Sequence, residues 1–338
     1  MTAPVSLRAP QFWWRKPGPL AALLYPVAAI YGGVAGMRLA REGYRAKIPV
    51  LCIGNPTLGG AGKTPAAITI AKMLQAEGRT VFFLTRGYGG SEAGPLLVDL
   101  RKHSATEIGD EAPLLAKAAP TVVARDRAAG AKFAEANGAE ILLLDDGFQN
   151  PSLEKDFSLL VIDGAKGLGN GLVFPAGPLR APLKPQFTHA QAVVVVGDGN
   201  AGEKAARFAA EVGITVLRAK LTADAESARQ FSGKPVLAFA GIGAPEKFFA
   251  SLEAAGAEIV SRKPFGDHHR YSEEDAKALL REAAEKNLLL ATTAKDLARM
   301  SADANLSSLR ANALALNVSL AFDDEHTIKN LIWKALAR

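Results

Sequence analysis

The segment IPVLCIGNPTLGGAGKTP, residues 48–65, constrains the fold of this chain more than any other stretch. Residues 48–53 form a short apolar run with several β-branched side chains. Four glycines follow, and PAAITIAKMLQAEG then shows the apolar spacing of a helix that stops at a glycine. A strand, a glycine-rich loop and a helix in this order open a βαβ unit. The sequence therefore predicts an α/β fold with a mainly parallel sheet.

The glycine-rich loop has the residue types that a phosphate-binding loop needs. Glycines let consecutive backbone N–H groups surround phosphate oxygens, and the helix N-terminus adds partial positive charge. Lys63 can reach the β- and γ-phosphates, and Thr64 can bind Mg²⁺. One position departs from the usual pattern, because Thr57 stands where the first glycine is expected; a glycine-rich turn without a ligand is the weaker alternative. The predicted nucleotide-binding residues are Gly59, Gly60, Ala61, Gly62, Lys63 and Thr64.

A second segment, ILLLDDGFQ, places Asp145 and Asp146 at the end of an apolar run. An acidic residue at the end of a strand can hold the metal or its water opposite the threonine hydroxyl. Two adjacent acids could instead simply begin a turn. Together with the glycine-rich loop, the pair predicts a nucleotide site with Mg²⁺, in which Thr64, Asp145 and Asp146 lie on the metal side.

Strands and helices alternate along the rest of the chain. Strands are expected at 80–85, 121–124, 141–146, 157–163, 192–197 and 214–220, with helices from Glu107 and from Arg125. A second set has strands at 236–242, 257–263, 288–293 and 313–320, helices through Phe248 and from Ser272 to Lys286, and a C-terminal helix. The polar segment 223–234 separates the two sets. We therefore predict a P-loop NTPase-like domain at 44–228 and a smaller second α/β domain at 229–338 that closes a cleft.

The N-terminal segment, residues 1–43, differs in composition from both domains. Residues 1–47 contain seven basic residues against Glu42 alone, which accounts for the whole net charge of +6. Between Lys16 and Arg38 lie 21 uncharged, mostly apolar residues, interrupted by Pro26. A helix lying in the interface of an anionic membrane is favoured; a spanning helix and a helix packed on its own domain are the alternatives. A cleaved signal peptide is disfavoured, because the nucleotide site needs the cytoplasm.

The remaining composition argues against two other classes of protein. Nucleic-acid binding is disfavoured because the 291 residues after Lys47 are neutral overall, whereas a nucleic-acid binder usually spreads a basic face over its folded domains. A disulfide framework is impossible with a single cysteine, Cys52, so a reducing compartment fits best.

Several loops carry more polar residues than a plain connection needs. Arg86, in TRGYGG, follows a strand and could pair with phosphate. Asp110 and Glu111 are expected just inside a helix start, where acids also suit the helix dipole. The long connector 164–187 favours a substrate-binding or lid role. His268 and His269 lie together in FGDHHRYS, but no further zinc ligand stands at suitable spacing, so a zinc site is disfavoured.

The motifs GNPTLGGAGKTP, TRGYGG, GDEAPLLA, DDGFQ, FPAGPLR and FGDHHRYS, in this order behind an apolar N-terminus, resemble the tetraacyldisaccharide 4′-kinase family of Gram-negative bacteria. The resemblance extends from about Trp13 to the C-terminal helix. It implies a transferase that moves the γ-phosphate of ATP, with Mg²⁺, to the 4′-hydroxyl of tetraacyldisaccharide 1-phosphate and makes lipid IVA in lipid A biosynthesis. The lipid acceptor implies docking on the cytoplasmic face of the inner membrane.

The resemblance also implies roles for individual residues. Asp110 resembles the family's catalytic base and His268 its dyad partner, while Lys63 and Arg86 are assigned to phosphate contact. A base and a partner on different domains would mean that closure assembles the site. Two positions depart from the family pattern: Asn150 stands where histidine is usual, and Ala181 stands where glutamate is usual.

Two other classes of P-loop protein remain as alternatives. A membrane-associated ATPase switch of the positioning type would carry a lysine just before the two glycines, where this chain has Leu58. A GTP-dependent metallochaperone would need an Asn-Lys-x-Asp motif, which TTAKD at 292–296 does not supply.

Overall fold

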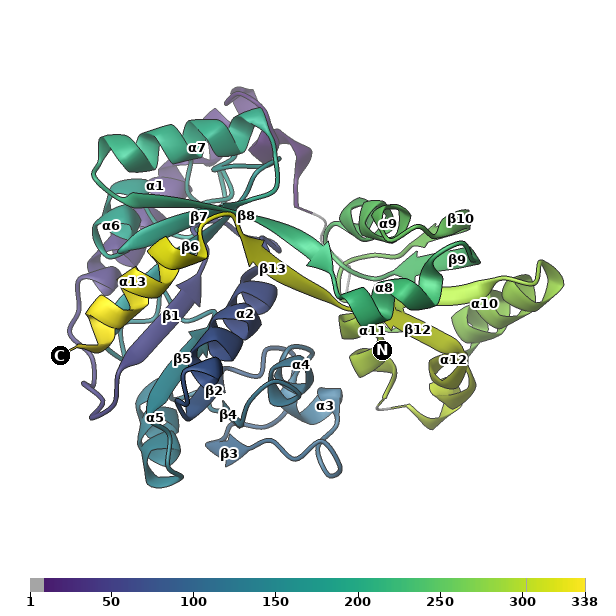
Figure 1. The fold of residues 1–338 in the computed structure, drawn as a ribbon. Coiled ribbons are helices and arrows are strands. Elements are labelled where there is room, and N and C mark those ends of the chain that lie inside the picture. Colours follow the sequence, from purple (N-terminus) through teal and green to yellow (C-terminus); the bar gives the residue numbers. More distant parts are fainter. Residues whose placement is uncertain (1–8, 302, 338) are drawn as a thin grey trace.

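A computed structural model describes residues 9–301 and 303–337 of the chain. Residues 1–8, with Arg8 of the predicted membrane-associating segment, lie outside the described residues, as do residues 302 and 338. Within the described ranges the strands form two sheets, each with its own helices, which lie side by side (Figure 1). The predicted α/β fold class is confirmed.

The larger sheet has nine strands among the described residues, in the order β13-β8-β7-β6-β1-β5-β2-β4-β3. Its pairs are parallel except β3 with β4 and β13 with β8. The strands are β1 Val50–Gly54, β2 Val81–Thr85, β3 Leu96–Leu97, β4 Thr121–Val123, β5 Ile141–Asp145, β6 Phe157–Asp163, β7 Ala192–Val196, β8 Thr215–Ala223 and β13 Val318–Phe322. The accompanying helices are α2 Lys63–Ala76, α3 Ala105–Ile108, α4 Ala112–Ala116, α5 Arg127–Ala136, α6 Leu183–Thr188, α7 Asn200–Glu211 and α13 Glu325–Leu336.

The smaller sheet has four parallel strands among the described residues, in the order β10-β9-β11-β12. Its strands are β9 Pro235–Ala240, β10 Glu258–Pro264, β11 Leu289–Thr293 and β12 Ala313–Leu316. The helices of this part are α8 Ala225–Phe231, α9 Pro245–Ala254, α10 Glu273–Glu285, α11 Ala294–Met300 and α12 Ser307–Asn312, with the short 3₁₀ helix η2 Ala304–Leu306. The polar segment expected as a separator therefore contains helix α8.

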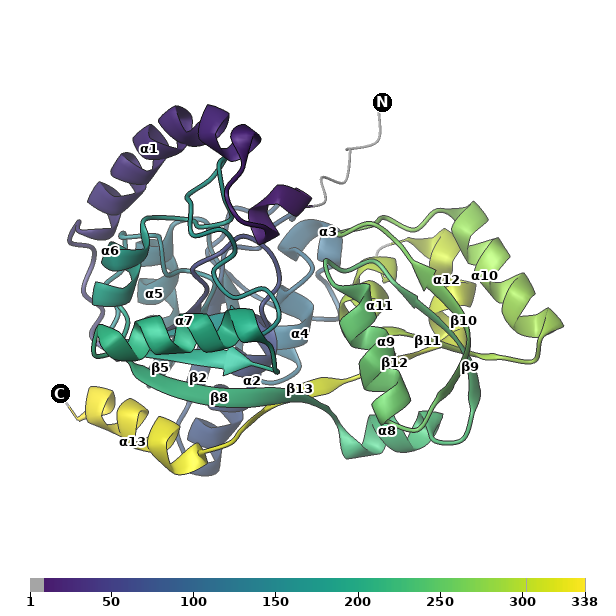
Figure 2. The same ribbon diagram turned by 90° about the horizontal axis from the view of Figure 1, so that it is seen from above.

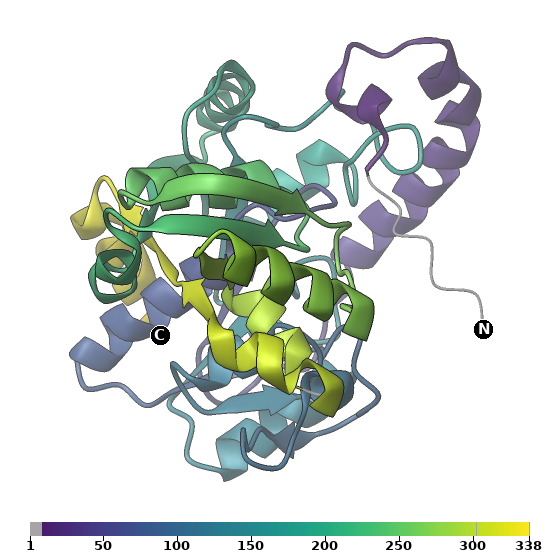
Figure 3. The same ribbon diagram turned by 90° about the vertical axis from the view of Figure 1, so that its right-hand side faces the viewer.

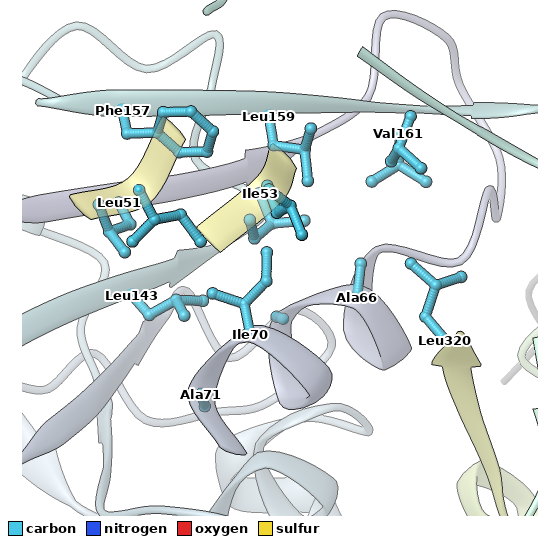
Figure 4. Close-up of a cluster of buried hydrophobic side chains, with 14 of the residues drawn as sticks. Leu51, Ile53, Ala66, Ile70, Ala71, Leu143, Phe157, Leu159, Val161 and Leu320 are labelled. Atoms are coloured by element: carbon cyan, nitrogen blue, oxygen red, sulfur yellow. The ribbon is translucent and has the colours of Figure 1, made fainter. Parts of the chain in front are cut away.

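The core of the larger part explains why the residues of strand β1 form a continuous apolar run. Leu51 and Ile53 face a cluster that includes Ile70 of α2, whereas Val50 and Cys52 face a second cluster on the opposite side. Figure 4 shows the first cluster, with Leu51 and Ile53 above Ile70. Because helices cover both faces of the parallel sheet, successive residues of the central strand are all buried. This packing fixes the strand and the helix between which the glycine-rich loop runs.

The end of the chain is arranged differently from the sequence-based expectation. Residues 313–320 were expected as one strand of the second domain, but the chain changes sheets at Asn317: β12 joins the smaller sheet and β13 pairs with β8 of the larger one. The physical reason is burial, because Leu320 packs in the same core as Ile70, and Ile328 and Ile332 of α13 are buried there too. The expected division at residue 229 stays a prediction, but residues 318–336 pack with the larger sheet rather than the smaller one.

The N-terminal helix α1, Pro19–Leu39, follows the short 3₁₀ helix η1, Gln11–Trp14. It lies along the outer edge of the larger part, away from the smaller sheet (Figures 2 and 3). One side of α1 packs on the connector, where a Cβ on Gly32 would lie 3.5 Å from Pro182. The side chain of Trp13 is buried and its Nε1 donates to the carbonyl of Pro175 at 3.0 Å. The helix is long and apolar enough to cross a membrane by length and composition.

Candidate active site

The glycine-rich loop lies between β1 and α2, as predicted, and its backbone needs glycine at two positions. Gly59 has φ 107° and Gly62 has φ 95°, a region that side chains with a Cβ rarely adopt. Gly62 is the residue immediately before α2, so the left-handed turn there sets the direction in which the helix begins. The loop thus presents a helix N-terminus, which suits a phosphate group.

Lys63, the first residue of α2, is held inside this loop. Its side chain is 9% exposed, and its Nζ donates to Asn55 Oδ1 at 3.1 Å and lies 3.5 Å from Asp146 Oδ2. Asn55 Nδ2 in turn donates to the carbonyl of Gly59 at 3.0 Å. Asn55 therefore ties the lysine to the loop backbone, a role that the sequence analysis did not assign to it.

The two acids at the end of β5 have different surroundings. Asp145 is buried, and its Oδ2 accepts from Thr64 Oγ1 at 3.0 Å. In the part of the chain that the structure describes, its Oδ1 is buried without a hydrogen-bond partner. Burial, and next the negative charge of Glu111, raise the pKa of Asp145 to about 7. A buried carboxylate with a free oxygen beside a threonine hydroxyl suits a cation as its partner.

Asp146 turns away with φ 58° and forms ion pairs. Arg180, from the connector, donates to Asp146 Oδ1 at 2.8 Å and to Oδ2 at 3.1 Å, and its Nε donates to the carbonyl of Thr57 at 3.1 Å. Burial alone would raise the pKa of Asp146, but the charges of Lys63 and Arg180 outweigh it and hold that pKa below its ordinary value. Arg180 of the FPAGPLR motif thus links the connector to the phosphate loop. The sequence analysis did not predict this contact.

Magnesium fits the residues at the end of β5. Mg²⁺ is typically bound by one or two carboxylates together with substrate phosphates and waters, so a large protein cage is not needed. Asp145 Oδ1 and the Thr64 hydroxyl are oxygen ligands of the kind Mg²⁺ prefers. Among the described residues no cluster of three or more His, Cys, Asp or Glu side chains could hold a metal alone.

A carboxylate–imidazole pair joins the two parts of the molecule. Asp110, between α3 and α4, accepts from His268 Nδ1 at 2.9 Å, and His268 lies in the loop after β10. The helix expected from Glu107 is broken here, because Gly109 has φ 83° and a Cβ there would lie 2.5 Å from the carbonyl oxygen of Tyr88. Asp110 therefore lies in the turn between two short helices, whereas the sequence placed it just inside a helix.

The surroundings of Asp110 keep it ionised. Burial would raise its pKa, but the hydrogen bond from His268 and the charge of Arg299 outweigh burial, so its pKa lies below the ordinary value. An ionised carboxylate can accept a proton, which makes the pair chemically able to act as a base.

Helix α11 adds two cations that sequence reasoning missed. Lys295 Nζ donates to Glu111 Oε1 at 2.7 Å, and Arg299 Nε donates to Asp110 Oδ2 at 2.7 Å. Both acids belong to the Gly-Asp-Glu motif of the larger part. Lys295 stands inside TTAKD, which the sequence analysis compares only with a guanine-reading motif, and Arg299 follows three residues after that motif. The spacing of four residues between the two cations places them on one face of a helix.

The remaining candidates have plain local roles in the structure. Arg86 is exposed directly after β2, and its predicted phosphate contact stays a prediction. Asn150 Oδ1 accepts from the backbone N–H of Ser152 at 2.9 Å, which closes a turn. Ala181 is buried, and its carbonyl accepts from Gln186 Nε2 at 2.7 Å.

Comparisons with known proteins agree over nearly the whole chain. Residues 20–337 match the family described as Tetraacyldisaccharide-1-P 4′-kinase. A curated protein named "Tetraacyldisaccharide 4′-kinase" from Methylobacterium sp. strain 4-46 is 52% identical, covering 94% of this chain and 95% of the relative. A protein of the same name from Xanthobacter autotrophicus is 50% identical, with 98% of each chain covered. The solved "apo" form of LpxK from Aquifex aeolicus in complex with ATP aligns with a TM-score of 0.73 at 26% identity, over 94% of this chain and 99% of that one.

Proposed function

The chain belongs to the tetraacyldisaccharide-1-P 4′-kinase family, and from this premise we propose how its residues share the work of phosphoryl transfer. The protein is a kinase that transfers the γ-phosphate of ATP to the 4′-hydroxyl of tetraacyldisaccharide 1-phosphate, a step of lipid A biosynthesis that forms lipid IVA. The observation that carries the residue-level proposal is the contact of Asp110 with His268, which joins the two parts of the molecule.

The phosphates of ATP are held by the glycine-rich loop. Backbone N–H groups of residues 59–64 surround the phosphate oxygens, and the N-terminus of α2 favours their negative charge. Lys63 is already held in the loop by Asn55, so its ammonium group needs little ordering before it contacts the β- and γ-phosphates. Arg86 follows strand β2, which is separated from β1 by β5 in the sheet, and supplies a second cation for phosphate.

The residues that hold Mg²⁺ are Thr64 and Asp145, with Asp146 beside them. When bound, Mg²⁺ neutralises charge that develops on the transferred phosphoryl group. Asp145 Oδ1 and the Thr64 hydroxyl, which now donates to Asp145 Oδ2 at 3.0 Å, would be the oxygens that hold the metal. Asp146 keeps Arg180 and Lys63 in place through its ion pairs.

Asp110 removes the proton of the sugar hydroxyl. Its Oδ2 is occupied by His268 and Arg299, so Oδ1 is the oxygen that accepts the proton. Because His268 Nδ1 lies 2.9 Å from Asp110 Oδ2, the ring proton of His268 is assigned to Nδ1. This hydrogen bond also fixes the orientation of the Asp110 carboxylate. The proton moves from the 4′-hydroxyl to Asp110 as the oxygen attacks the γ-phosphorus and ADP leaves.

The lipid acceptor is reached from the membrane surface. Helix α1 exposes large apolar side chains, among them Leu23 at 75%, Ile30 at 73% and Met37 at 65%. An open apolar hollow of about 570 Å³ lies between the start of α1 and Leu172 of the connector. Basic residues flank the helix, which suits the anionic cytoplasmic face of the inner membrane. We therefore assign α1 to peripheral or monotopic docking on that face.

A transfer assay tests the residue-level proposal. Wild type and Asp110→Asn are incubated with ATP labelled on its γ-phosphate, Mg²⁺ and tetraacyldisaccharide 1-phosphate in detergent micelles, with a control lacking lipid. Labelled lipid is expected with wild type, and its rate of formation falls by at least about 100-fold in the variant. Equal rates would remove Asp110 as the base. Free phosphate without labelled lipid in the wild type would favour the ATPase-switch alternative.

A further inference from the structure

Arg299 of α11 is buried beside Asp110, and hydrogen bonds fix the orientation of its guanidinium group. Its side chain is 7% exposed. Besides the 2.7 Å hydrogen bond from Nε to Asp110 Oδ2, its Nη1 donates to the carbonyl of Gly241 at 2.6 Å and to Asp296 Oδ1 at 2.9 Å. Its Nη2 lies 3.4 Å from His268 Nδ1. The guanidinium thus contacts both members of the dyad and is fixed from the other side.

The anchor behind Arg299 is itself rigid. Asp296 is fully buried; its Oδ2 accepts from Thr293 Oγ1 at 2.6 Å, and both its oxygens accept from the backbone N–H of Gly241. Burying a carboxylate this deeply is costly unless it is paired and hydrogen-bonded. The pairing with Arg299 meets that requirement, so a stable arrangement holds the guanidinium in one orientation toward Asp110.

The charges around Asp110 show what Arg299 supplies. His268 contributes a hydrogen bond from an imidazole, and Arg299 contributes a permanent positive charge. The other charged groups near the dyad are Glu111 with Lys295, Asp296 behind Arg299, and Asp267, whose Oδ1 is 4.0 Å from His268 Nε2. Lys295 pairs with Glu111 and Asp296 lies on the far side, so within residues 9–301 and 303–337 Arg299 is the permanently charged cation that contacts the base.

We propose that Arg299 is a positioning residue for the reaction: it keeps the Asp110 carboxylate ionised and engages Oδ2, so that Oδ1 faces the acceptor hydroxyl. The proposal rests on the assigned role of Asp110 as the base. It also gives the TTAKD segment a function, because helix α11 begins there. Helix α11 belongs to the smaller part, so Arg299 contacts Asp110 of the larger part only when the two parts meet.

Substitution of Arg299 separates this role from a purely structural one. Without its charge, the pKa of Asp110 rises, because one of the two side chains that offset the effect of burial is then lost. A growing fraction of Asp110 is then protonated as the pH falls, and a protonated base is inactive. Loss of a structural contact alone would lower kcat by the same factor at every pH. The dependence of kcat on pH therefore distinguishes the two roles.

The experiment measures kcat and the KM for ATP of the full-length protein between about pH 5 and about pH 9. Variants are Arg299→Gln and Arg299→Lys, and the matched control is Lys247→Gln, which removes another ion pair between the parts, Lys247 Nζ with Asp163 Oδ2 at 2.6 Å. In Arg299→Gln we expect the ratio of kcat at about pH 5.5 to kcat at about pH 8 to fall roughly three- to ten-fold below that of wild type, with little change in KM. Lysine keeps the charge but cannot make the three contacts, so it restores the ratio only in part. Lys247→Gln keeps the wild-type ratio.

Two results would overturn the proposal. One is an Arg299→Gln profile that is lowered evenly at all pH values, and the other is a Lys247→Gln profile shifted as far as that of Arg299→Gln. Thermal unfolding of each variant at about pH 5.5 and about pH 8 checks that the protein is folded at both pH values where kcat is compared. The transfer rate of Asp110→Asn tests the base assignment separately. If Asp110 is not the base, this variant retains wild-type transfer, and the pH profiles of the Arg299 variants can still be compared with that of wild type.

Discussion

Asp145→Asn is expected to stabilise the protein in the absence of metal and nucleotide. The ordinary pKa of the carboxyl group is 3.8, and in the folded protein it is about 7. The folded state therefore binds this proton more tightly than the unfolded chain. The stability that this binding contributes is fully present below about pH 4 and is lost as the pH rises through about 7. Above pH 7 the wild-type protein carries a buried carboxylate without a cation.

The size of the effect follows from the difference between the two pKa values. A difference of about three units corresponds to about 4 kcal/mol at most, and relaxation around Lys63 and Glu111 reduces this to roughly 2–4 kcal/mol. Asparagine has nearly the same shape and carries no charge, so the variant avoids the cost. In a chain of this size the gain raises the midpoint of thermal unfolding by about 3–6 °C at pH 8.

The assay is thermal unfolding of both proteins with a metal chelator, from about pH 4.5 to about pH 8. The difference in midpoint should grow with pH, and transfer of phosphate should be lost in the variant at every pH. The control is Asp198→Asn, because the Asp198 side chain is 93% exposed and should show no such trend. A constant or shrinking difference between wild type and Asp145→Asn would refute the argument that burial of Asp145 opposes its ionisation.

Four further expectations follow from the site, the core and the N-terminal helix. Lys63→Ala should abolish transfer, because the phosphates lose the ammonium group held by Asn55; near wild-type turnover would contradict the phosphate-loop assignment. Asp110→Ala should lower kcat far more than it raises the KM for ATP, and a change confined to that KM would indicate nucleotide binding instead. Deleting residues 1–43, or changing exposed Leu23 to Glu, should reduce sedimentation with anionic vesicles, and unchanged sedimentation of both variants would exclude docking through α1. Ile70→Ala should lower the free energy of unfolding by about 2–5 kcal/mol in urea titrations, and a loss below about 1 kcal/mol would contradict the packing seen in Figure 4.

Much of the fold could be predicted from local pattern. The strand at 157–163 has the predicted bounds, and the glycine-rich loop lies between a strand and a helix as expected. These features depend on neighbouring residues: apolar runs fill a sheet that is covered on both faces, and glycines mark backbone conformations that other residues avoid. The order of the seven strands β1, β2 and β4–β8 was therefore predictable from local pattern, whereas β3 and the helices α6, α7, α8, α11 and α12 were not predicted.

The parts that could not be predicted depend on single contacts between distant residues. Arg180 meets Asp146 across 34 positions, and Arg299 meets Asp110 across 189 positions. Neither pair has a periodic signal, since each is formed by one side chain that a loop or a short helix brings to its partner. The division of residues 313–320 into two strands at Asn317 was not predicted for the same reason. Both β12 and β13 are apolar, and only tertiary packing decides which sheet each strand joins.

The return of β13 to the larger sheet also affects the order in which the protein can fold. Strand β13 pairs with β8, which ends 95 positions earlier in the chain (Figure 1). Its Leu320, together with Ile328 of α13, is buried in the same core as Ile70. During synthesis the whole smaller sheet leaves the ribosome before these residues do. Until then β8 has an unpaired edge and the core beneath α2 lacks part of its cover, a state prone to wrong pairings. The larger part of the enzyme thus begins synthesis first and is completed last, because its folding waits for residues 318–336.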